Sequence, residues 1–513
     1  MAIVTIPLAG QYGVITDQQP QELPINAWSY ASNMRFRDGC AERFGGEGQI
    51  FTSPSVTPYY IQPFTNVSGR YWIHAGLTSI YSDDGTTRTN ITGTAPTGAI
   101  DDRWTGGSLN GVAILNNGID VPQYWGGTGT FANLTAWPAN TRVSSLRPFK
   151  NYLVGLDVLK NKGTTNNRYP HMVKWSHAAD PGTIPSSYDE TDATKDAGEV
   201  DLAEEPSLMV DQLPMGDMNI IYKERSMYGM SFIGQPNIWR FQRLPGDIGA
   251  LARGCVASTP IGHVVLTAGD VILHSGQGPQ SIINAKMRRW LFNQIDSTNY
   301  KRAFVSANPA RNEVWICFPT AGDTTCRVAL VWNWTDATWT IRSLNNVTYA
   351  ASGQINYAAA SAWSSDTEAW QNDATSWNQD PFSPADHRLL TVGTTPIINL
   401  IDNGVTFNGS TFTSTIERTG MAFDAPDTVK TIRHLVPRID AASGTQIRIQ
   451  FGGAMDAEKG PTWSDPITYT VGSSYKADGF ATGRFLAIRL TSMDDSYWRL
   501  KSMDVDIVKS GMY

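Results

Sequence analysis

The sequence is poor in charge. Asp, Glu, Lys and Arg make up 17% of its 513 residues, against a usual ~25%. There are 40 Lys and Arg and 47 Asp and Glu, for a formal net charge of −7. A protein that binds nucleic acid tightly needs clustered basic residues to displace the counterions of the phosphates. The balance therefore argues against nucleic-acid binding, but not against a surface that DNA passes without being held.

Other absences exclude further classes. No run of about 18 apolar residues is present, so we expect no membrane span, and the N-terminus lacks the basic and apolar regions of a signal peptide. None of the four cysteines belongs to a Cys-x-x-Cys pair. Buried free thiols are favoured over a disulfide and fit assembly in a reducing cytoplasm. These cysteines are Cys40, Cys255, Cys317 and Cys326.

Motifs for catalysis and cofactor binding are also missing. The chain has no Gly-x-x-x-x-Gly-Lys-Ser/Thr loop and no Gly-x-Ser-x-Gly elbow. His171 and His177, with Asp180 nearby, are more simply surface loop residues than metal ligands. Asp83-Asp84-Gly85 is better explained as a hairpin turn than as a calcium loop. We predict no catalytic residues, no cofactor and no metal.

Turn and strand formers are abundant instead. The chain has 46 Gly, 28 Pro and 17 Trp, which predicts many short strands joined by turns. Residues 302–344 contain four such strands in about 43 residues, the size of one propeller blade. Residues 71–92 and 112–135 repeat at an offset of 43, with four matching positions. The pairs are Tyr81 and Tyr124, Thr87 and Thr130, Asn90 and Asn133, and Thr92 and Thr135.

The prediction is an all-β protein, a β-propeller with an additional β-sandwich-like C-terminal domain. Residues 1–29 are expected to pack with the second β body, 30–350 to form the propeller, 351–409 to be a linker or insertion, and 410–513 to form the sandwich-like domain. One short helix is expected at 285–294. The polar stretch 163–206 is expected to be either an insertion or a functional loop.

A Trp/Asp repeat is the most unusual local feature. Trp363, Trp370 and Trp377 are spaced by seven, and each is followed three residues later by Asp. Trp is a preferred residue of binding hot spots, so one interpretation is a partner-docking patch. The other, which we weight more heavily, is that the indoles pack onto their own protein.

Several segments resemble the tail nozzle proteins of short-tailed phages, also called stabilisation or tail tubular B-like proteins. The similarity covers about two thirds of the chain in patches. It includes 24–28, 33–39, 42–46, 173–181, 197–202, 222–228, the Trp/Asp repeat, 483–486 and 498–500.

The resemblance implies a non-enzymatic virion protein, made and assembled in the host cytoplasm. Such proteins form a six-fold ring below the portal and adaptor of the tail, and each subunit carries a β-propeller. The ring prolongs the channel through which genomic DNA leaves, and it contacts tail fibres, spikes or a plug.

Two other hypotheses stay open. The chain could be a propeller glycosidase or polysaccharide depolymerase of a phage tail, which would need two carboxylates in a cleft at hydrolytic separation. It could also be a glycan-binding module without turnover, which would show saturable binding and no cleavage.

Overall fold

The computed structural model describes residues 2–355 and 387–512. Nearly all of its regular structure is β, which confirms the all-β prediction. One α-helix, α1 (Arg288–Gln294), lies within the helix predicted at 285–294. Single 3-10 turns occur at η1 (Pro20–Glu22), η2 (Tyr300–Arg302) and η3 (Pro309–Arg311).

Strands β5 to β31 form six antiparallel sheets, which we call the six-sheet body and number along the chain. The first two are separate four-stranded meanders. Their strands match at the 43-residue offset, which confirms the repeat. Sheet one contains β6 (Tyr60–Asn66), β7 (Gly69–Ala75), β8 (Ile80–Asp83) and β9 (Arg88–Asn90), and sheet two β10 (Thr105–Leu109), β11 (Val112–Asn116), β12 (Gln123–Trp125) and β13 (Ala132–Asn133).

Local sequence explains how such a meander forms. Asn110 and Gly111 join β10 to β11 and both have positive φ, 50° and 87°. That conformation suits a two-residue hairpin turn and is tolerated by Asn and Gly. The strand after the turn, β11, is buried along its whole length, because it lies between two other strands and two neighbouring sheets.

Sheets three to five repeat the four-stranded pattern. The polar stretch 163–206 supplies β16 and β17, with 176–197 as the connection between them. The strands are β14 (Arg142–Phe149), β15 (Tyr152–Lys160), β16 (Asn167–Trp175) and β17 (Gly198–Asp201); β18 (Met209–Met215), β19 (Met218–Lys223), β20 (Met227–Phe232) and β21 (Trp239–Arg243); β22 (Val256–Thr259), β23 (Gly262–Leu266), β24 (Val271–His274) and β25 (Pro279–Ser281).

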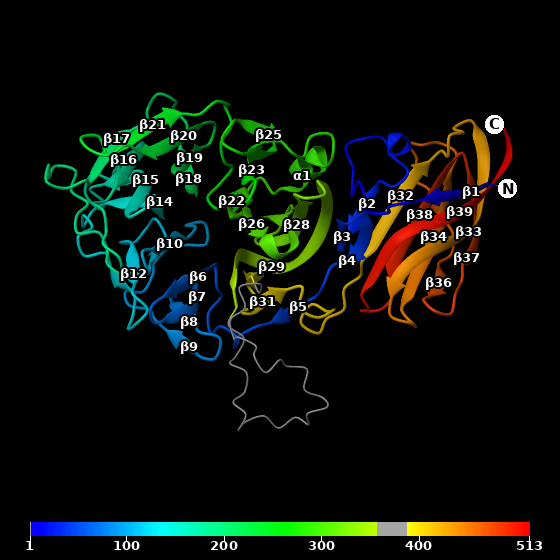
Figure 1. Cartoon of the computed structure of the whole chain (residues 1–513), viewed down its shortest axis with the longest axis horizontal. Helices are drawn as coiled ribbons and strands as arrows, with labels where there is room; N and C mark the ends of the chain where they lie inside the picture. The colour runs from blue at the N-terminus through cyan, green and yellow to red at the C-terminus, as the bar shows by residue number, and fades with distance from the viewer. Residues whose placement is uncertain (1, 356–386, 513) are drawn as a thin grey trace, which may run out of the picture.

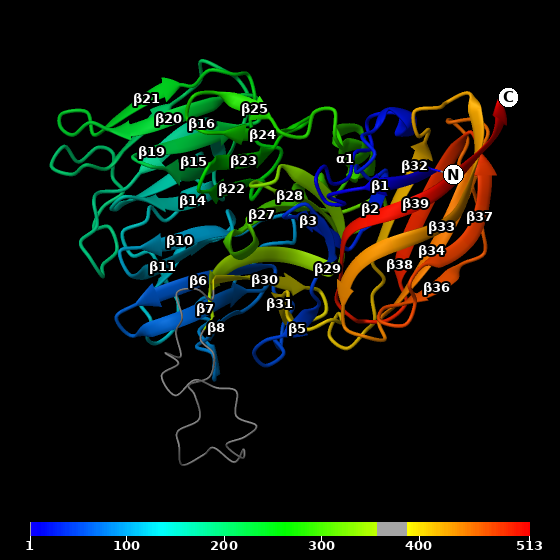
Figure 2. The same cartoon turned by 45° about the vertical axis from the view of Figure 1, so that its right-hand side comes forward.

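The sixth sheet has seven strands and contains the four predicted between 302 and 344. Its long strand β29 pairs first with β28 and then with β30, and it curves along the body in Figure 2. The strands are β26 (Phe304–Asn308), β27 (Glu313–Phe318), β28 (Cys326–Asn333), β29 (Thr338–Gln354), β30 (His387–Gly393), β31 (Ile398–Ile401) and β5 (Glu47–Gln49).

The six sheets follow one another in chain order around a common region, on the left of Figure 1. The first strands of successive sheets lie against each other, and β29 lies against β6. Apolar clusters fill the spaces between neighbouring sheets. For example, Phe64 of sheet one packs with Trp125 of sheet two, and Trp72 of sheet one joins a cluster with Leu390 of sheet six.

Strands β1 to β4 and β32 to β39 form two six-stranded sheets, which we call the two-sheet body. Figure 1 shows blue N-terminal strands beside orange and red C-terminal ones, with both chain ends at this body. One sheet contains β1 (Ala2–Ile6), β3 (Met34–Arg37), β4 (Cys40–Arg43), β33 (Thr428–Ala441), β37 (Ala477–Gly483) and β39 (Trp498–Met512). The other contains β2 (Tyr30–Ser32), β32 (Thr415–Met421), β34 (Gln446–Ala454), β35 (Thr462–Trp463), β36 (Ile467–Thr470) and β38 (Phe485–Ser492).

The core of the two-sheet body is apolar and continues into the six-sheet body. Ile432 and Val505 of one sheet and Ile488 of the other belong to a cluster that also contains Leu266 of sheet five. Side chains from both bodies are thus buried in one shared core.

The pairing differs from the predicted boundaries at two places. Strands β2 to β4 were expected within a propeller at 30–350, but β2 pairs with β32 and β4 with β39. Strands β30 and β31 lie in the predicted linker at 351–409, but they extend the sixth sheet. The first difference arises because strands distant in sequence pair, which a local pattern does not reveal. The second arises because β30 pairs with the preceding strand β29 although residues 355–386 separate them in the sequence.

Candidate docking surfaces and buried ionic centres

The predicted docking residues Trp363, Trp370 and Trp377 lie outside the described residues. The docking interpretation therefore stays a prediction.

A buried ion pair lies where the first strands of sheets three and four meet. Arg147 of β14 donates to both carboxylate oxygens of Asp211 of β18, at 2.7 and 2.8 Å. Asp211 also accepts from Ser145 Oγ and from the backbone N–H of Gly254, each at 3.0 Å. Burial alone would raise the pKa of Asp211, but the charge of Arg147 and these donors outweigh it and lower the pKa.

Aromatic side chains surround this pair. The rings of Tyr60 and Tyr349, from sheets one and six, lie 4.8 Å apart, and burial raises the pKa of Tyr60. Arg147 is within electrostatic range of both tyrosines. The region between the sheets is thus occupied by an ion pair and aromatic rings. These side chains fill the space that an open channel would need.

A second buried ionic centre joins the two bodies, and we call it the junction. Arg35 of β3, in the two-sheet body, pairs with Glu313 of β27 and, at 2.8 Å, with Asp402, which follows β31. The three side chains are 4, 1 and 6% exposed. Burial opposes charge on each, yet the charges of Asp402 and Glu313 raise the pKa of Arg35, and Arg35 lowers that of Asp402.

Further ionic contacts extend the junction. Arg342 of β29 donates to Glu47 of β5 at 3.2 Å, and neither side chain is exposed. Arg43 of β4 pairs with Asp495 at 3.1 Å and stacks on Phe412, with 4.0 Å between the guanidinium carbon and the ring centroid. These two pairs each lie within one body, whereas the pairs of Arg35 cross between the bodies. Relative motion of the two bodies would therefore leave Arg35, Glu313 and Asp402 with unpaired charge, which is strongly unfavourable.

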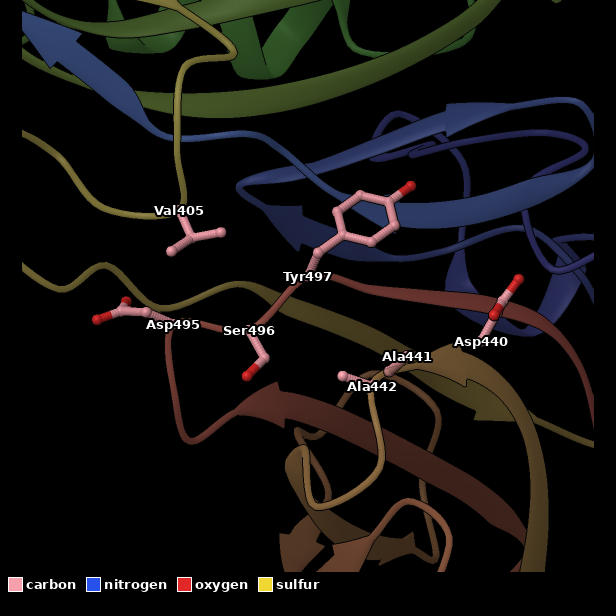
Figure 3. A pocket seen from close by; sticks show the side chains of 7 residues that line it. All are labelled: Val405, Asp440, Ala441, Ala442, Asp495, Ser496 and Tyr497. Carbon is pink, nitrogen blue, oxygen red and sulfur yellow. The ribbon is translucent and has the colours of Figure 1, made fainter. Parts of the chain in front are cut away.

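An open hollow of about 690 Å³ lies beside the junction, and Figure 3 shows its lining. Asp440 and Asp495 lie apart on its rim, with Val405 and two alanines between them. Tyr497 lies with its ring toward β3 and β4, and its hydroxyl donates to Glu42 at 2.6 Å. Burial, followed by this hydrogen bond, raises the pKa of Tyr497 to about 12.

An aromatic groove of about 660 Å³ lies between the outer strands of sheets three and four. Trp175, Trp239 and Phe241 line it together with polar residues. The rings of Trp175 and Phe241 are 5.9 Å apart. Asp196, also in the lining, accepts a hydrogen bond from Tyr152 at 3.3 Å.

Two glutamates near this groove, Glu190 and Glu199, are paired with lysines. Lys160 contacts Glu190 at 3.1 Å and Glu199 at 2.6 Å, and Lys174 contacts both carboxylates. Burial would raise the pKa of Glu190, but the hydrogen bond from Lys174 and further partners lower it to about 2. Glu190 is thus ionised at neutral pH and is not suited to act as a general acid.

The histidines weighed as metal ligands have structural contacts. His171 Nδ1 lies 3.1 Å from the carbonyl oxygen of Ser207, and His177 Nδ1 accepts from the Asp196 N–H at 3.0 Å. Within residues 2–355 and 387–512, no group of three or more His, Cys, Asp or Glu is placed to hold a metal ion.

The Asp83-Asp84-Gly85 turn joins β8 to β9, as predicted. Asp83 is buried and pairs with Arg88 at 3.0 Å. Asp84 accepts the N–H groups of Thr86 and Thr87, at 2.8 and 2.7 Å. These contacts account for both carboxylates as parts of a hairpin.

All four cysteines are free thiols, as predicted, and Cys255, Cys317 and Cys326 are buried. Burial raises the pKa of Cys255 and of Cys326 to about 12. These two thiols are therefore protonated and poorly nucleophilic at neutral pH.

The ionic centres were missed from the sequence, although one local signal was present. Arg147 and Asp211 interrupt apolar strands at 143–149 and 209–213, and a charged residue in a buried strand needs a partner. The partners of Arg35 are more than 270 residues away, so no spacing pattern could identify them.

In the described part of the chain, no helix is long and apolar enough to cross a membrane. No family model matches the chain, and no curated protein matches it.

Two solved structures are similar at low identity. The computationally designed Ika8 protein is 10% identical, with 76% of this chain and 99% of that chain covered and a TM-score of 0.37. Raptor from Chaetomium thermophilum is 8% identical, with 70% of this chain covered and a TM-score of 0.39. The chain spans 29% of that Raptor chain.

Proposed function

We propose that the chain is a structural ring subunit of a short-tailed phage tail, a nozzle protein without catalytic activity. In this proposal the six-sheet body is a six-bladed β-propeller and the two-sheet body is a β-sandwich. Six copies form a ring below the portal and adaptor, extend the DNA-exit channel in the virion tail, and hold fibre, spike or plug proteins.

The observation that carries the proposal is the junction. Arg35 reaches from the two-sheet body to two carboxylates of the six-sheet body and is buried with them. Such an arrangement opposes hinge motion, and a ring subunit that carries other tail parts needs a fixed shape. Arg35 also lies in segment 33–39, one of those that resemble nozzle proteins.

The packing of the sheets supports the propeller. The first strands contact one another in chain order, and an apolar cluster lies between sheets six and one as well as between earlier neighbours. Radial repetition of four-stranded sheets is the propeller architecture. Because paired charges occupy the region between the sheets, we propose that DNA passes through the centre of the ring of subunits and not through the propeller.

Surface properties support assembly without DNA binding. The net charge of −7 disfavours retention of DNA phosphates. Ile3 of β1 and Phe480 of β37 are 69 and 72% exposed, and in this proposal they contribute to subunit contacts. We propose that the isolated chain is monomeric and that rings form on the portal complex.

The test is electron microscopy of intact particles labelled with an antibody against this chain. Antibody preabsorbed with the purified chain is the control. Label in six-fold rings at the tail below the portal is expected. Label on lateral spikes, or on no particle, would overturn the proposal and lead to glycan digestion assays.

The aromatic groove favours a second candidate, a glycan-binding module. Trp175 and Phe241 offer aromatic faces, and Asn237 and Asp196 offer polar groups beside them. Saturable binding of host glycan that Asn237→Ala weakens, without cleavage, would favour this candidate. Asn133→Ala is the control, because Asn133 is exposed and lies outside the groove.

A further inference from the structure

A cavity of about 190 Å³ lies near the starts of sheets one and two, against sheet six. One water molecule needs only ~10–15 Å³ of such space, so the cavity has room for a polyatomic ion. Most of its polar lining consists of two arginines and four threonines, with Tyr59 and Cys326 beside them: Arg103, Arg302, Thr324, Thr325, Thr348 and Thr394. None of the lining residues is Asp or Glu.

Arg103 is the unusual member of this lining. Its side chain is 9% exposed, and among the described residues no carboxylate lies within ion-pair distance of it. Its Nη1 donates to the carbonyl oxygen of Arg302 at 3.3 Å, while its Nη2 is buried without an acceptor in the described structure. The rings of Phe304 and Tyr349 lie 5.9 and 5.7 Å from its guanidinium carbon and compensate part of the burial. They leave Nη2 without an acceptor, so an anion beside it would be favourable.

Neighbouring groups add positive charge. Arg302 forms an ion pair with the carboxylate of Asp101 at 2.7 Å. Among the described residues, Arg253 donates to the backbone carbonyl oxygens of Arg103 and Ser144, at 3.2 and 2.7 Å, and Asp211, Asp102 and Asp157 act on it from farther away. The region around Arg103 therefore holds three guanidinium groups, of which Arg302 is in direct contact with a carboxylate.

We propose that this cavity binds a small oxyanion of the phosphate or carboxylate type. Arg103 and Arg302 supply the charge, since a planar guanidinium matches the geometry of such anions. The hydroxyls of Thr324 and Thr394 can serve as further donors, whereas those of Thr325 and Thr348 already donate to Asn346 and to the backbone carbonyls of Pro58 and Val392. The bound anion links the segment before β10, the segment before β26 and strand β29, and it thus stabilises the place where sheets one, two and six meet.

Isothermal titration calorimetry on the full chain tests the proposal. Sodium phosphate is titrated in a phosphate-free buffer at constant ionic strength, and N-acetylglycine is titrated separately as a probe for a polypeptide carboxylate. One anion is expected to bind per chain. Binding of phosphate alone points to free phosphate as the source, and binding of N-acetylglycine alone to a chain terminus; either result supports the site.

Arginine variants assign the binding to the cavity. Arg103→Met is expected to raise the Kd at least tenfold, and Arg103→Lys, which keeps the charge but loses the planar fork, by less. Arg327→Met is the matched control, because Arg327 is 58% exposed and does not line the cavity; its Kd should stay within twofold. Equal losses in Arg103→Met and Arg327→Met would overturn the site.

A second variant covers the case in which Arg103→Met does not fold. Ile100→Trp fills the cavity from its lining and keeps both arginines. It should abolish binding, and the rise in Tm that phosphate gives the wild-type chain should disappear with it. Failure of the wild-type chain to bind either probe, or undiminished binding in Ile100→Trp, would refute the proposal.

Discussion

The two bodies are built by opposite routes. Each of the first five sheets of the six-sheet body forms from one continuous stretch of chain, with neighbouring strands paired in order. In the two-sheet body, strands from residues 2–43 pair with strands from 415–512, as Glu42 does with Arg499. Local pairing closes short loops and distant pairing closes very long ones, so we expect the six-sheet body to form first.

The bodies also bury charge with different partners. In the two-sheet body, whose core is apolar, buried Arg418 donates to the backbone carbonyl oxygens of Pro20 and Leu23. The six-sheet body instead buries the ion pair of Arg147 and Asp211 between its sheets. Apolar packing is non-directional, but an ion pair requires its partners in one geometry. The ion pairs of Arg147 and of Arg35 thus hold separate sheets and bodies in register.

Removal of the junction arginine should have the largest effect on stability. Arg35→Met leaves Glu313 and Asp402 buried without their main partner, so the free energy of unfolding should fall by about 3–5 kcal/mol. Differential scanning calorimetry should then show two transitions in place of one, as the bodies separate. Arg433→Met is the control: Arg433 is 42% exposed and 4.0 Å from Asp506, so its loss should matter by less than about 1 kcal/mol. Equal effects of the two variants would show that the junction does not couple the bodies.

Truncation in β1 should destabilise the two-sheet body most strongly. Ile6 is fully buried and pairs with Met503 of β39. Ile6→Ala should lower the free energy of unfolding by about 2–5 kcal/mol. Because regions can open locally before the whole chain unfolds, hydrogen exchange should accelerate more in β39 than in β15. Ile3→Ala on the same strand is the control, since Ile3 is 69% exposed; equal acceleration in β39 and β15 would show that the two bodies open only together.

Acid should weaken the contact between sheets four and five. His263 of β23 lies 2.9 Å from Tyr222 Oη and 3.0 Å from the carbonyl oxygen of Pro214. The neutral ring satisfies both contacts if Nε2 carries the proton and Nδ1 accepts from tyrosine. Burial lowers the pKa of His263 from 6.5 to about 4.

The direction of the pH effect follows from the lowered pKa. Below about pH 6.5, His263 is protonated in the unfolded chain but stays neutral in the folded chain. The free energy of unfolding therefore decreases as the pH falls toward 4. The loss is at most about 3 kcal/mol. Urea unfolding between pH 7 and 4 measures it, and His263→Gln should flatten the slope. An unchanged slope in that variant would show that other groups cause the acid sensitivity.

The same comparison explains what the sequence could predict. The strands between 302 and 344 and the 43-residue repeat were recognisable because hairpins are encoded locally, by turn residues between apolar runs. The placement of β2 to β4 was not, because their partners are near the other end of the chain. The junction was equally hidden, since residues 35, 313 and 402 meet only after both bodies have formed.

The smallest effect is expected at the surface of sheet three. Glu190 has a pKa lowered from 4.5 to about 2, where burial acts against the lowering and the hydrogen bond from Lys174 drives it. A lowered carboxyl pKa stabilises the fold above about pH 4.5, and this contribution is lost as the pH falls toward 2. Because Glu190 is partly exposed, solvent screening should limit it to about 1 kcal/mol or less.

Glu190→Gln tests whether this contribution stays local or reaches the strands at the centre of the six-sheet body. The variant should change the free energy of unfolding at pH 7 only slightly, and hydrogen exchange should accelerate in the connection 176–197 and not in β14 or β18. Lys174 retains Glu199 at 3.4 Å in that variant, so it is not left unpaired. Faster exchange in β14 would mean that surface charges support the Arg147 and Asp211 pair, and it would contradict a small, local effect of Glu190.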